Sequence, residues 1–457
     1  MVKTIEEKLA RFAFDTTYTD IPLEVIQHAK LIIADTFAVI IKGFRTNYIK
    51  NLVYQLKSEA RSYIISTSLR SVPTSAAFLN ASAGTVLELD EGHRTAGSHM
   101  AVQSLPSIIS TIQKDKDLTG KEFLTSFIIG YEIGTRVGYA VKPLRKGLHT
   151  HGTWGAVGAA VSAILNEPNL KLNWIVESIR ISANMAHSTT WESAIKGATV
   201  RNIYAGLASS AGVLSATLAK TGLTGPKNAL YNSLAVAVSS TSTLNKDPSF
   251  NLGKEYLILK NYFKRYPCCG YTHPIIEALY KLEFPKHKDI NSIKQIEVYT
   301  FSEATKLNNV HPKNTLAAKF SVPFIIANII SRKGVGIKIF EKENIKSKDW
   351  LPFAKKVKLI NSSKFEANFP DKWGAEVRIL FNDGTELSST CDNPQGDWMN
   401  PFSQEELFNK FFLLLQDILE EKYLRKLWSI LNNLENINSI YELLDDIDQN
   451  VKDNYYK

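Results

Sequence analysis

Apolar residues recur at helical spacing through the first half of the chain. Between residues 21 and 43 they occupy one face of a predicted helix that ends at Gly43: Val25, Ile26, Ala29, Ile32, Ile33 and Phe37. Later segments, around residues 76–89, 153–165 and 205–220, are rich in alanine, glycine and serine. Small side chains at spacings of three or four let helices pack closely. The pattern predicts a large all-helical domain over residues 1–265.

The pattern changes near residue 265. Residues 294–301 alternate as a strand does, and two further strands flank the turn Asn382-Asp383-Gly384, which predicts a hairpin. Between them, residues 315–331 read as helix interrupted at Pro323. We therefore expect a smaller α+β domain over residues 266–395. From Gln404 the helical pattern returns, and residues 396–457 are predicted to be helices that pack back on the first domain.

Composition indicates an ordinary globular chain of two or three domains. It has 457 residues, of which 44% are hydrophobic and 22% charged. Three cysteines, two of them adjacent, exclude a disulfide framework and indicate a reducing compartment. The N-terminus lacks a signal-peptide pattern, and no apolar stretch is long enough to cross a bilayer. These features predict a soluble, cytoplasmic protein that does not bind membranes.

The positive charge is local. The formal net charge is +9, and residues 254–360 alone hold 20 Lys and Arg against 9 Asp and Glu. Such a segment could attract nucleic acid or an anionic metabolite. However, it contains no zinc finger, RNP motif or arginine-rich tract, and its lysines are spread out. We favour a solvated basic surface and expect no nucleic-acid partner.

The first group of reactive side chains lies between residues 88 and 99. Three carboxylates, two histidines and an arginine occur there within twelve residues: Glu88, Asp90, Glu91, His93, Arg94 and His99. Gly92 and Gly97 mark turns, so we expect a loop after a helix. Carboxylate and imidazole side by side suit proton transfer, because each moves the other's pKa towards neutrality. A polar loop with local hydrogen bonds is the alternative, but the density of titratable groups favours a site.

The second group is the segment 149–153, His-Thr-His-Gly-Thr, which we expect to open an alanine-rich helix. A helix N-terminus could hold a carboxylate there, although Thr153 could simply cap the helix. A His-x-His pair also suits zinc, but zinc usually takes four ligands in a fixed arrangement. Cys268 and Cys269 are adjacent rather than in C-x-x-C spacing. We therefore expect neither a metal nor an iron–sulfur cluster.

The third group consists of cations. Arg201 precedes another helix of small residues. A cation at a helix N-terminus is unfavourable unless an anion neutralises it, and the guanidinium group matches the geometry of a carboxylate. Lys264 lies at the predicted domain junction, before a turn rich in Pro and Gly, and His273 is expected to open the next helix. No Walker loop, Rossmann fingerprint, nucleophile elbow or kinase signature occurs. These residues predict a site that works without a cofactor. It would remove a proton from the carbon next to a carboxylate of an anionic substrate.

At these segments the chain resembles the MmgE/PrpD family. LELDEGHRTAGSHM resembles the family's acidic loop, GLHTHGTWGAVGAA its Phe/Leu-His-x-Thr-Gly-Thr element, and FKRYPCCGYTHP its Lys-x-Tyr-Pro-Cys-Cys element. VRNIYAGLASSAG resembles its Lys-Arg-Leu-His-x-Gly element. The resemblance covers nearly the whole chain, in order. It implies a large helical domain built from both chain ends, a smaller α+β lid domain, a homodimer, and metal-independent chemistry on di- or tricarboxylates.

The resemblance and the residue chemistry together assign the site. Catalytic roles fall to Asp90, His99 and His149. Substrate-binding roles fall to His93, Arg201 and Lys264. Glu88 is an alternative to Asp90, because the loop is one residue longer than in the family's decarboxylases.

Three positions depart from the family pattern and indicate a separate branch. Gly92 stands where dehydratases and decarboxylases often have Thr, Arg201 where they often have Lys, and Met100 replaces the usual Pro. The expected function is a lyase on a small polycarboxylate, foremost dehydration or hydration of a 2-methylcitrate-like substrate. Decarboxylation of the cis-aconitate type and epimerisation of the iminodisuccinate type are alternatives. A further alternative is a protein of another class, whose catalytically inactive site binds an anion or RNA.

Overall fold

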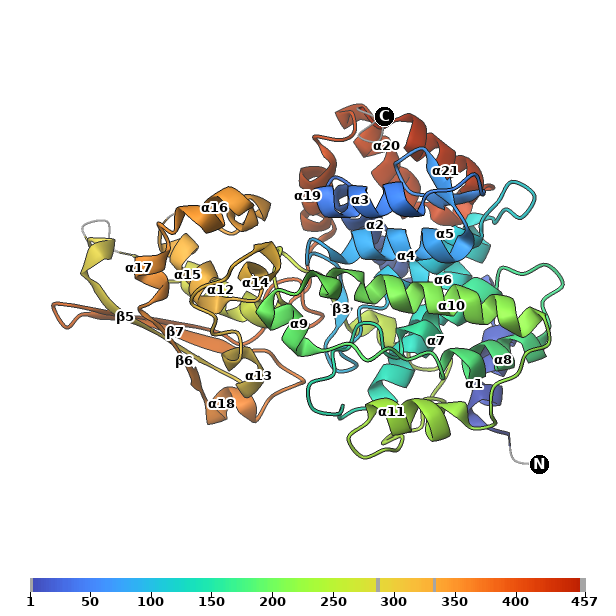
Figure 1. Cartoon of the computed structure of the whole chain (residues 1–457), viewed down its shortest axis with the longest axis horizontal. Coiled ribbons are helices and arrows are strands. Elements are labelled where there is room, and N and C mark those ends of the chain that lie inside the picture. Colours follow the sequence, from blue (N-terminus) through green and yellow to red (C-terminus); the bar gives the residue numbers. More distant parts are fainter. Residues whose placement is uncertain (1–2, 285–287, 332–333, 453–457) are drawn as a thin grey trace.

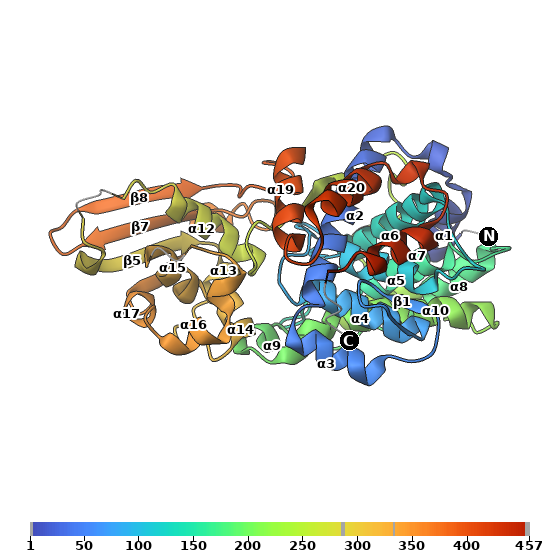
Figure 2. The same cartoon turned by 90° about the horizontal axis from the view of Figure 1, so that it is seen from above.

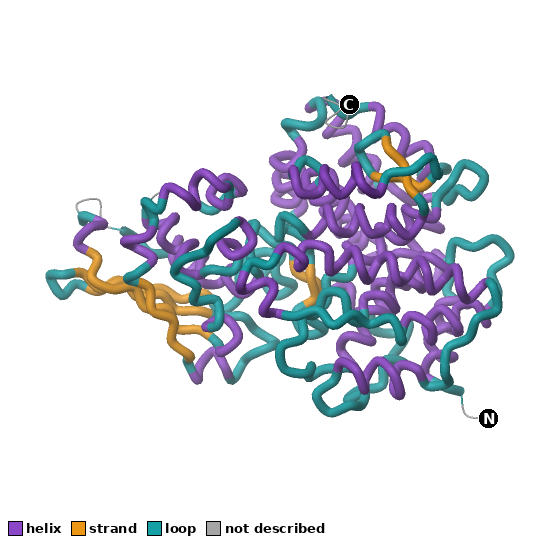
Figure 3. Tube along the Cα trace, viewed as in Figure 1, coloured by secondary structure: helices purple, strands orange, loops and turns teal. Residues whose placement is uncertain are grey.

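The computed structural model describes residues 3–284, 288–331 and 334–452, which form a larger helical body and a smaller body with a sheet (Figures 1 and 3). The helices of the larger body that precede the sheet are α1 Ile5–Asp15, α2 Leu23–Gly43, α3 Asn47–Leu56, α4 Pro73–Thr85, α5 Ala101–Thr111, α6 Gly120–Ala140, α7 Gly155–Ile164, α8 Leu172–Ser182, α9 Trp191–Lys196, α10 Tyr204–Lys220 and α11 Val236–Val238.

Close approach between helices explains the small residues of this body. Helix α7 packs against both α6 and α10. A Cβ on Gly212 of α10 would lie 2.5 Å from the Cβ of Ala159 on α7, so the packing requires glycine there. Helix α2 ends at Gly43, as predicted, and a Cβ at that position would meet the carbonyl oxygen of Ala83 at 1.9 Å.

The C-terminal helices complete the larger body. They are α19 Gln404–Leu415, α20 Glu421–Asn432 and α21 Ile440–Gln449. Leu415, Leu427 and Ile447 are buried in the same apolar core as Phe37 of α2. Figure 2 shows α19 and α20 lying alongside α2. Helices from both ends of the described chain therefore share one core.

The smaller body is a mixed sheet with helices on one face. Its strands are β5 Ile293–Thr300, β6 Val357–Asn361, β7 Ala375–Phe381 and β8 Glu386–Cys391, in the order β6-β5-β7-β8. The β5–β6 pair is parallel and the other two pairs are antiparallel, with the predicted hairpin between β7 and β8. Its helices are α12 His273–Tyr280, α13 Ser302–Thr305, α14 Thr315–Lys319, α15 Val322–Ile330, α16 Lys342–Ser347, α17 Leu351–Ala354 and α18 Ser363–Glu366.

Alternation along β7 shows how this sheet is covered. Val377 and Ile379 are buried with Ile276 of α12 and Phe324 of α15 in one core, whereas Arg378 points to the more exposed face. The predicted helix over 315–331 is two helices, α14 and α15, and Pro323 lies in the first turn of α15 rather than inside one helix.

Two short ladders add strand structure to the domain that we expected to be all-helical. Strands β1 Ser62–Ile64 and β2 Leu69–Ser71 pair with each other. Strand β3 Gly92–His93 pairs with β4 Asn261–Tyr262. The described chain remains mostly helical, which agrees with the predicted fold class.

The two bodies have separate apolar cores and meet around an aromatic cluster that includes Tyr262, Phe301 and Trp373. Helix α9 also joins them, because Ala194 is buried in the core of the smaller body. The domain limits proposed from the sequence, 265/266 and 395/396, stay predictions. Within the described residues, no helix has the length and apolar character needed to cross a membrane.

Helix α19 offers a matched test of this packing. Leu415 is fully buried, whereas Leu413, two positions earlier, is 64% exposed. We expect Leu415→Ala to lower the free energy of unfolding by about 2–5 kcal/mol, because it leaves a cavity in the core shared with α2. Leu413→Ala should change it by less than about 0.5 kcal/mol. Urea unfolding of both variants measures the difference, and equal effects would contradict the assigned packing.

Candidate active site

The acidic loop predicted at residues 88–99 connects α4 to α5 where the two bodies meet. Its strand β3 pairs with β4, which ends two residues before Lys264. A Cβ on Gly92 would lie 2.5 Å from the hydroxyl oxygen of Tyr262, so this approach requires glycine. The pairing brings the acidic loop beside Lys264.

Two carboxylates and two cations form what we call the ion cluster: Glu88, Asp90, Arg201 and Lys264. The Lys264 ammonium lies 3.1 Å from a Glu88 oxygen and 3.3 Å from an Asp90 oxygen. The Arg201 guanidinium lies 2.5 Å from the other Glu88 oxygen. None of the four residues is more than 2% exposed. Since an unpaired buried charge is very costly, pairing is a condition for burying this cluster.

Contacts within the ion cluster keep Asp90 and Lys264 charged. Burial alone would raise the pKa of Asp90, but the charges of Lys264 and His99 hold that pKa below its usual value. Burial likewise opposes the charge on Lys264, but Asp90 and Glu88 raise the pKa of its ammonium. At neutral pH the site therefore contains an ionised carboxylate and an ionised amine in direct contact.

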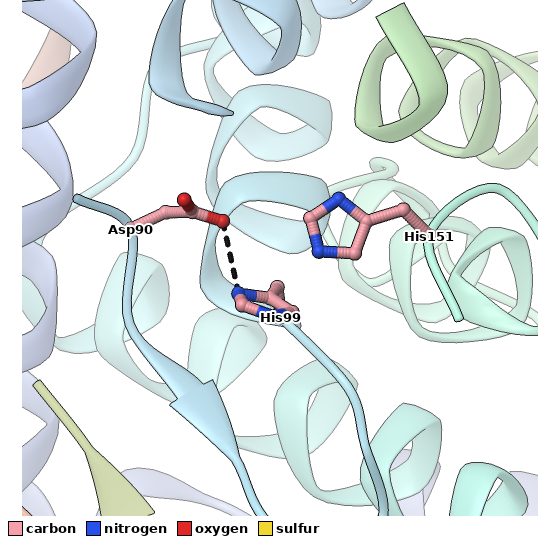
Figure 4. A group of neighbouring side chains, drawn as sticks. All are labelled: Asp90, His99 and His151. Carbon is pink, nitrogen blue, oxygen red and sulfur yellow. Dashed lines mark ion pairs between the residues drawn. The ribbon is translucent and has the colours of Figure 1, made fainter. Parts of the chain in front are cut away.

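His99 is held by Asp90. Its Nδ1 lies 2.9 Å from Oδ2 of Asp90 (Figure 4), and its Nε2 lies 3.5 Å from the Tyr262 hydroxyl. A carboxylate in this position orients the ring. The His99 side chain also lines the cavity described below. It can therefore take up or release a proton at Nε2.

The His149 ring is neutral and oriented so that it can donate a hydrogen bond. The backbone N–H of His151 donates to Nδ1 of His149 at 3.0 Å, so the ring proton of neutral His149 is on Nε2. Burial and the charge of Arg201 lower its pKa well below the usual value, which keeps the ring neutral. Among the described residues Nε2 has no hydrogen-bond partner, and the ring lines the cavity. An N–H is thus available to a bound ligand.

The expected helix N-terminus at His149 is absent from the described structure. Helix α7 begins at Gly155, and the Thr153 hydroxyl donates to the carbonyl of Thr150 at 2.7 Å instead of capping the helix. The segment is a turn whose geometry depends on side-chain hydrogen bonds. A helix dipole therefore does not explain how the site would hold an anion at His149.

Arg201 and His93, both predicted to bind substrate, line the same cavity. Arg201 lies in a 3₁₀ turn before α10, and it donates to the Thr85 hydroxyl at 2.9 Å in addition to its pair with Glu88. The anion that neutralises it is thus a carboxylate of the protein. His93 accepts the backbone N–H of Ala96 at Nδ1, and burial and the charge of Lys142 lower its pKa to about 3, so it is neutral.

A cavity of about 810 Å³ opens beside these groups, between the two bodies. Trp373 and Lys306 of the smaller body line it together with His99 and His149 of the larger one. Cations beyond the ion cluster dominate its charged lining: Arg94, Lys142, Arg145, Lys146, Lys196, Lys246 and Lys306. The carboxylates in the lining are Glu88, Glu192 and Glu303. An excess of positive charge in a concave site attracts small anions.

Three site residues were not assigned roles from the sequence. Tyr262 stands two positions before Lys264, and residues two apart in an extended chain share a face, which could have identified it. Lys142 carried no sequence signal; burial lowers its pKa to about 8. His151 was noted only as part of a His-x-His pair. Its ring, Asp90 and His99 offer ligand atoms that all lie within 4.8 Å of one another, which could hold a metal ion.

The structure thus defines a mostly helical protein of two domains, with buried histidines beside a cationic cavity. Comparison with family models extends this result. Residues 7–243 match the model of the MmgE/PrpD N-terminal domain, and residues 266–436 match that of the MmgE/PrpD C-terminal domain. The chain belongs to the MmgE/PrpD family, whose members are lyases.

Curated relatives align over almost their whole length. A cis-aconitate decarboxylase of Aspergillus terreus is 24% identical over 471 residues, which cover 96% of this chain and 95% of the relative. The cis-aconitate decarboxylase of Homo sapiens is 24% identical over 459 residues, covering 96% and 93%. That of Mus musculus is 22% identical over 460 residues, covering 96% and 92%.

Glu91 anchors the acidic loop from its buried side. Its carboxyl group accepts the backbone N–H of Ala101 at 2.9 Å and the hydroxyl of Tyr131 at 2.8 Å. Burial raises the pKa of Glu91 to about 8, from an ordinary value of 4.5. Between about pH 4.5 and pH 8 the folded chain keeps a proton that the unfolded chain releases. The stability of the fold therefore falls as the pH rises through this range.

Replacing Glu91 removes this pH dependence. Glu91→Gln can still accept from Ala101, donates to the Tyr131 oxygen and cannot ionise. Relative to the wild type, we expect it to gain stability from pH 5 to pH 8, on the order of a few kcal/mol. Urea unfolding at both pH values measures the gain. Parallel curves for the two proteins would mean that Glu91 is ionised in the folded state.

Proposed function

We propose that this chain is a lyase that acts on a small di- or tricarboxylate with its own histidines and cations. The observation that carries the proposal is one cationic cavity that contains the Asp90-supported imidazole of His99 and the free N–H of His149. Cations of the lining, among them Lys264, would hold carboxylates, and His99 would move a proton at carbon. Stabilising the charge that develops on a carboxylate is the main task of such a site.

Decarboxylation of an unsaturated tricarboxylate such as cis-aconitate is the reaction we favour. The supporting fact is that the relatives named above, which align from end to end, carry this activity in their names. In the step, the bond between the carbon skeleton and one carboxylate breaks and CO₂ leaves. The electron pair stays on the skeleton, and the proton of the His99 imidazolium joins it there. His149 would donate to a carboxylate that remains.

Dehydration or hydration of a 2-methylcitrate-like substrate, the reaction favoured from the sequence, is the second candidate. It needs a base for the proton on carbon and an acid for the departing hydroxyl. Tyr262 supports it through geometry, because its hydroxyl lines the cavity 3.5 Å from Nε2 of His99 and would donate a hydrogen bond to the departing hydroxyl. The homodimer implied by the family resemblance stays a prediction.

A substrate panel distinguishes these reactions. The protein is incubated in heavy water with cis-aconitate, 2-methylcitrate, citrate and iminodisuccinate, and NMR follows substrate and product. We expect cis-aconitate to lose CO₂ and its product to carry one deuterium from the solvent. Turnover of 2-methylcitrate alone would select the second candidate, and deuterium exchange into iminodisuccinate would select epimerisation. Absence of any reaction together with salt-sensitive RNA binding would favour a dead-site binding protein.

The two histidines can be tested separately. We expect His99→Gln to lower kcat/KM on the true substrate by about 10²–10⁴-fold, the usual contribution of a general acid or base. His149→Gln should lower it by about 10–100-fold, the value of a hydrogen bond to a charged group. His311→Gln, the same change at an exposed position of the smaller body, is the control and should leave kcat/KM unchanged. Wild-type kinetics in either site variant would place the chemistry elsewhere.

Arg201 is expected to select the substrate. Its guanidinium can hold two oxygens at once, whereas an ammonium acts as a point charge. Arg201→Lys should raise KM by about tenfold, the value of one lost charge-assisted hydrogen bond. Steady-state kinetics and thermal melting are measured together. A lower melting temperature with an unchanged KM would show that Arg201 serves only as the partner of Glu88.

A further inference from the structure

His151 is a buried imidazole beside the candidate active site. It is fully buried, and neither of its ring nitrogens has a hydrogen-bond partner among the described residues. The ring packs edge-on against His99, with 4.1 Å between ring centroids. Leaving a buried donor or acceptor unsatisfied costs about 1–3 kcal/mol. Since His151 is also not among the residues that line the cavity, the proposed reaction does not account for it.

The His151 ring faces the pair formed by Asp90 and His99 (Figure 4). One ligand atom from each of the three residues falls within 4.8 Å of the other two. Asp90 and His99 belong to the acidic loop, whereas His151 belongs to the segment 149–153, so the fold brings the third residue to the other two. Burial, followed by the charge of His99, lowers the pKa of His151 well below its usual value, and a neutral imidazole is the form that binds metals.

We propose that Asp90, His99 and His151 form a binding site for Zn²⁺. Two imidazoles and one carboxylate with a fourth position open is a ligand set that zinc accepts in proteins. Oδ2 of Asp90, which faces His99, would turn to the metal. Lys264 would stay on Oδ1 and hold the carboxylate in place, as outer partners of metal ligands usually do.

The charge of the surroundings determines the fourth ligand. In the ion cluster the two carboxylates already balance Arg201 and Lys264. A zinc ion adds two positive charges to this buried region, which is unfavourable unless an anion accompanies it. The fourth ligand is therefore an anion, either hydroxide or a carboxylate from solution.

Zinc at this site inhibits the enzyme, a consequence that rests on the proposed function. The ion takes the Asp90 oxygen that supports His99 and one nitrogen of the His99 ring, so the ring can no longer change its protonation state and the zinc-loaded protein is inactive. Enzyme treated with EDTA retains full activity, because no step of the proposed reaction uses the metal.

Calorimetry tests the binding without reference to activity. Zinc chloride is titrated into chelator-stripped wild type, His151→Gln and His311→Gln, the last as a control for zinc bound by surface histidines. We expect one Zn²⁺ per chain in the wild type and the control. Loss of outer partners alone weakens metal sites by about 10–100-fold, so loss of the ligand His151 should weaken binding by at least about 100-fold. Absence of saturable binding to the wild type, or equal binding to His151→Gln, overturns the site.

Activity measurements complete the test. Zinc should abolish turnover of the wild type, EDTA should restore it, and His151→Gln should remain active at zinc concentrations that inhibit the wild type. His151→Gln keeps the backbone N–H that orients His149. Equal inhibition of wild type and His151→Gln would refute the inhibitory role. If binding depends on His151 but no panel substrate is turned over, the zinc site stands and the proposed function fails.

Discussion

The burial of four charges in one place is the constraint on which the rest of the site depends. Glu88 and Asp90 are stable inside the protein only because Lys264 and Arg201 reach them, and those cations need the carboxylates equally. The members come from residue 88 to residue 264, so the site exists only when segments far apart in the chain are packed correctly. The same pairing gives Asp90 the charge with which it supports His99.

Lysines of the smaller body and of α19 bind the backbone at the start of the acidic loop and just before it. Lys319 of the smaller body donates to the carbonyl of Val86, and Lys410 of α19 donates to the carbonyl of Leu89. Arg94 of the loop in turn pairs with Asp397 and donates a hydrogen bond to the carbonyl of Asp371. The loop is thus tied to both bodies and to the C-terminal helices. A shift of the smaller body relative to the larger one would therefore reach the carboxylates of the site directly.

Periodicity was sufficient to predict the longer elements, but neither the short strands nor the contacts between elements. The apolar stripe before Gly43 and the alternation around Asn382-Asp383-Gly384 identify a helix and a hairpin, because each pattern reflects which side of the element is buried. The short ladder of β3 with β4 has no such pattern, since two residues are too few. The ladder depends on the close approach of Tyr262 to Gly92, which only the three-dimensional structure shows.

The candidate site was predictable in its residue types and less so in its pairing. Clusters of acid, histidine and cation identified Asp90, His99, His149 and Lys264, all of which the structure brings together. The sequence could not indicate that Arg201 pairs with Glu88, because that contact joins segments more than a hundred residues apart. His151 was undervalued for a similar reason: Asp90 and His99, which its ring faces, lie more than fifty residues earlier in the sequence.

The shared core of α2 and α19–α21 has a consequence for how the protein is made. During synthesis the N-terminal helices leave the ribosome first, but the surface that α19–α21 cover stays open until the last helices have been translated. The smaller body, with its own core, is completed in the meantime. A premature stop codon after that body would release a chain that carries every residue of the candidate site, yet exposes the apolar side of α2 to chaperones and proteases.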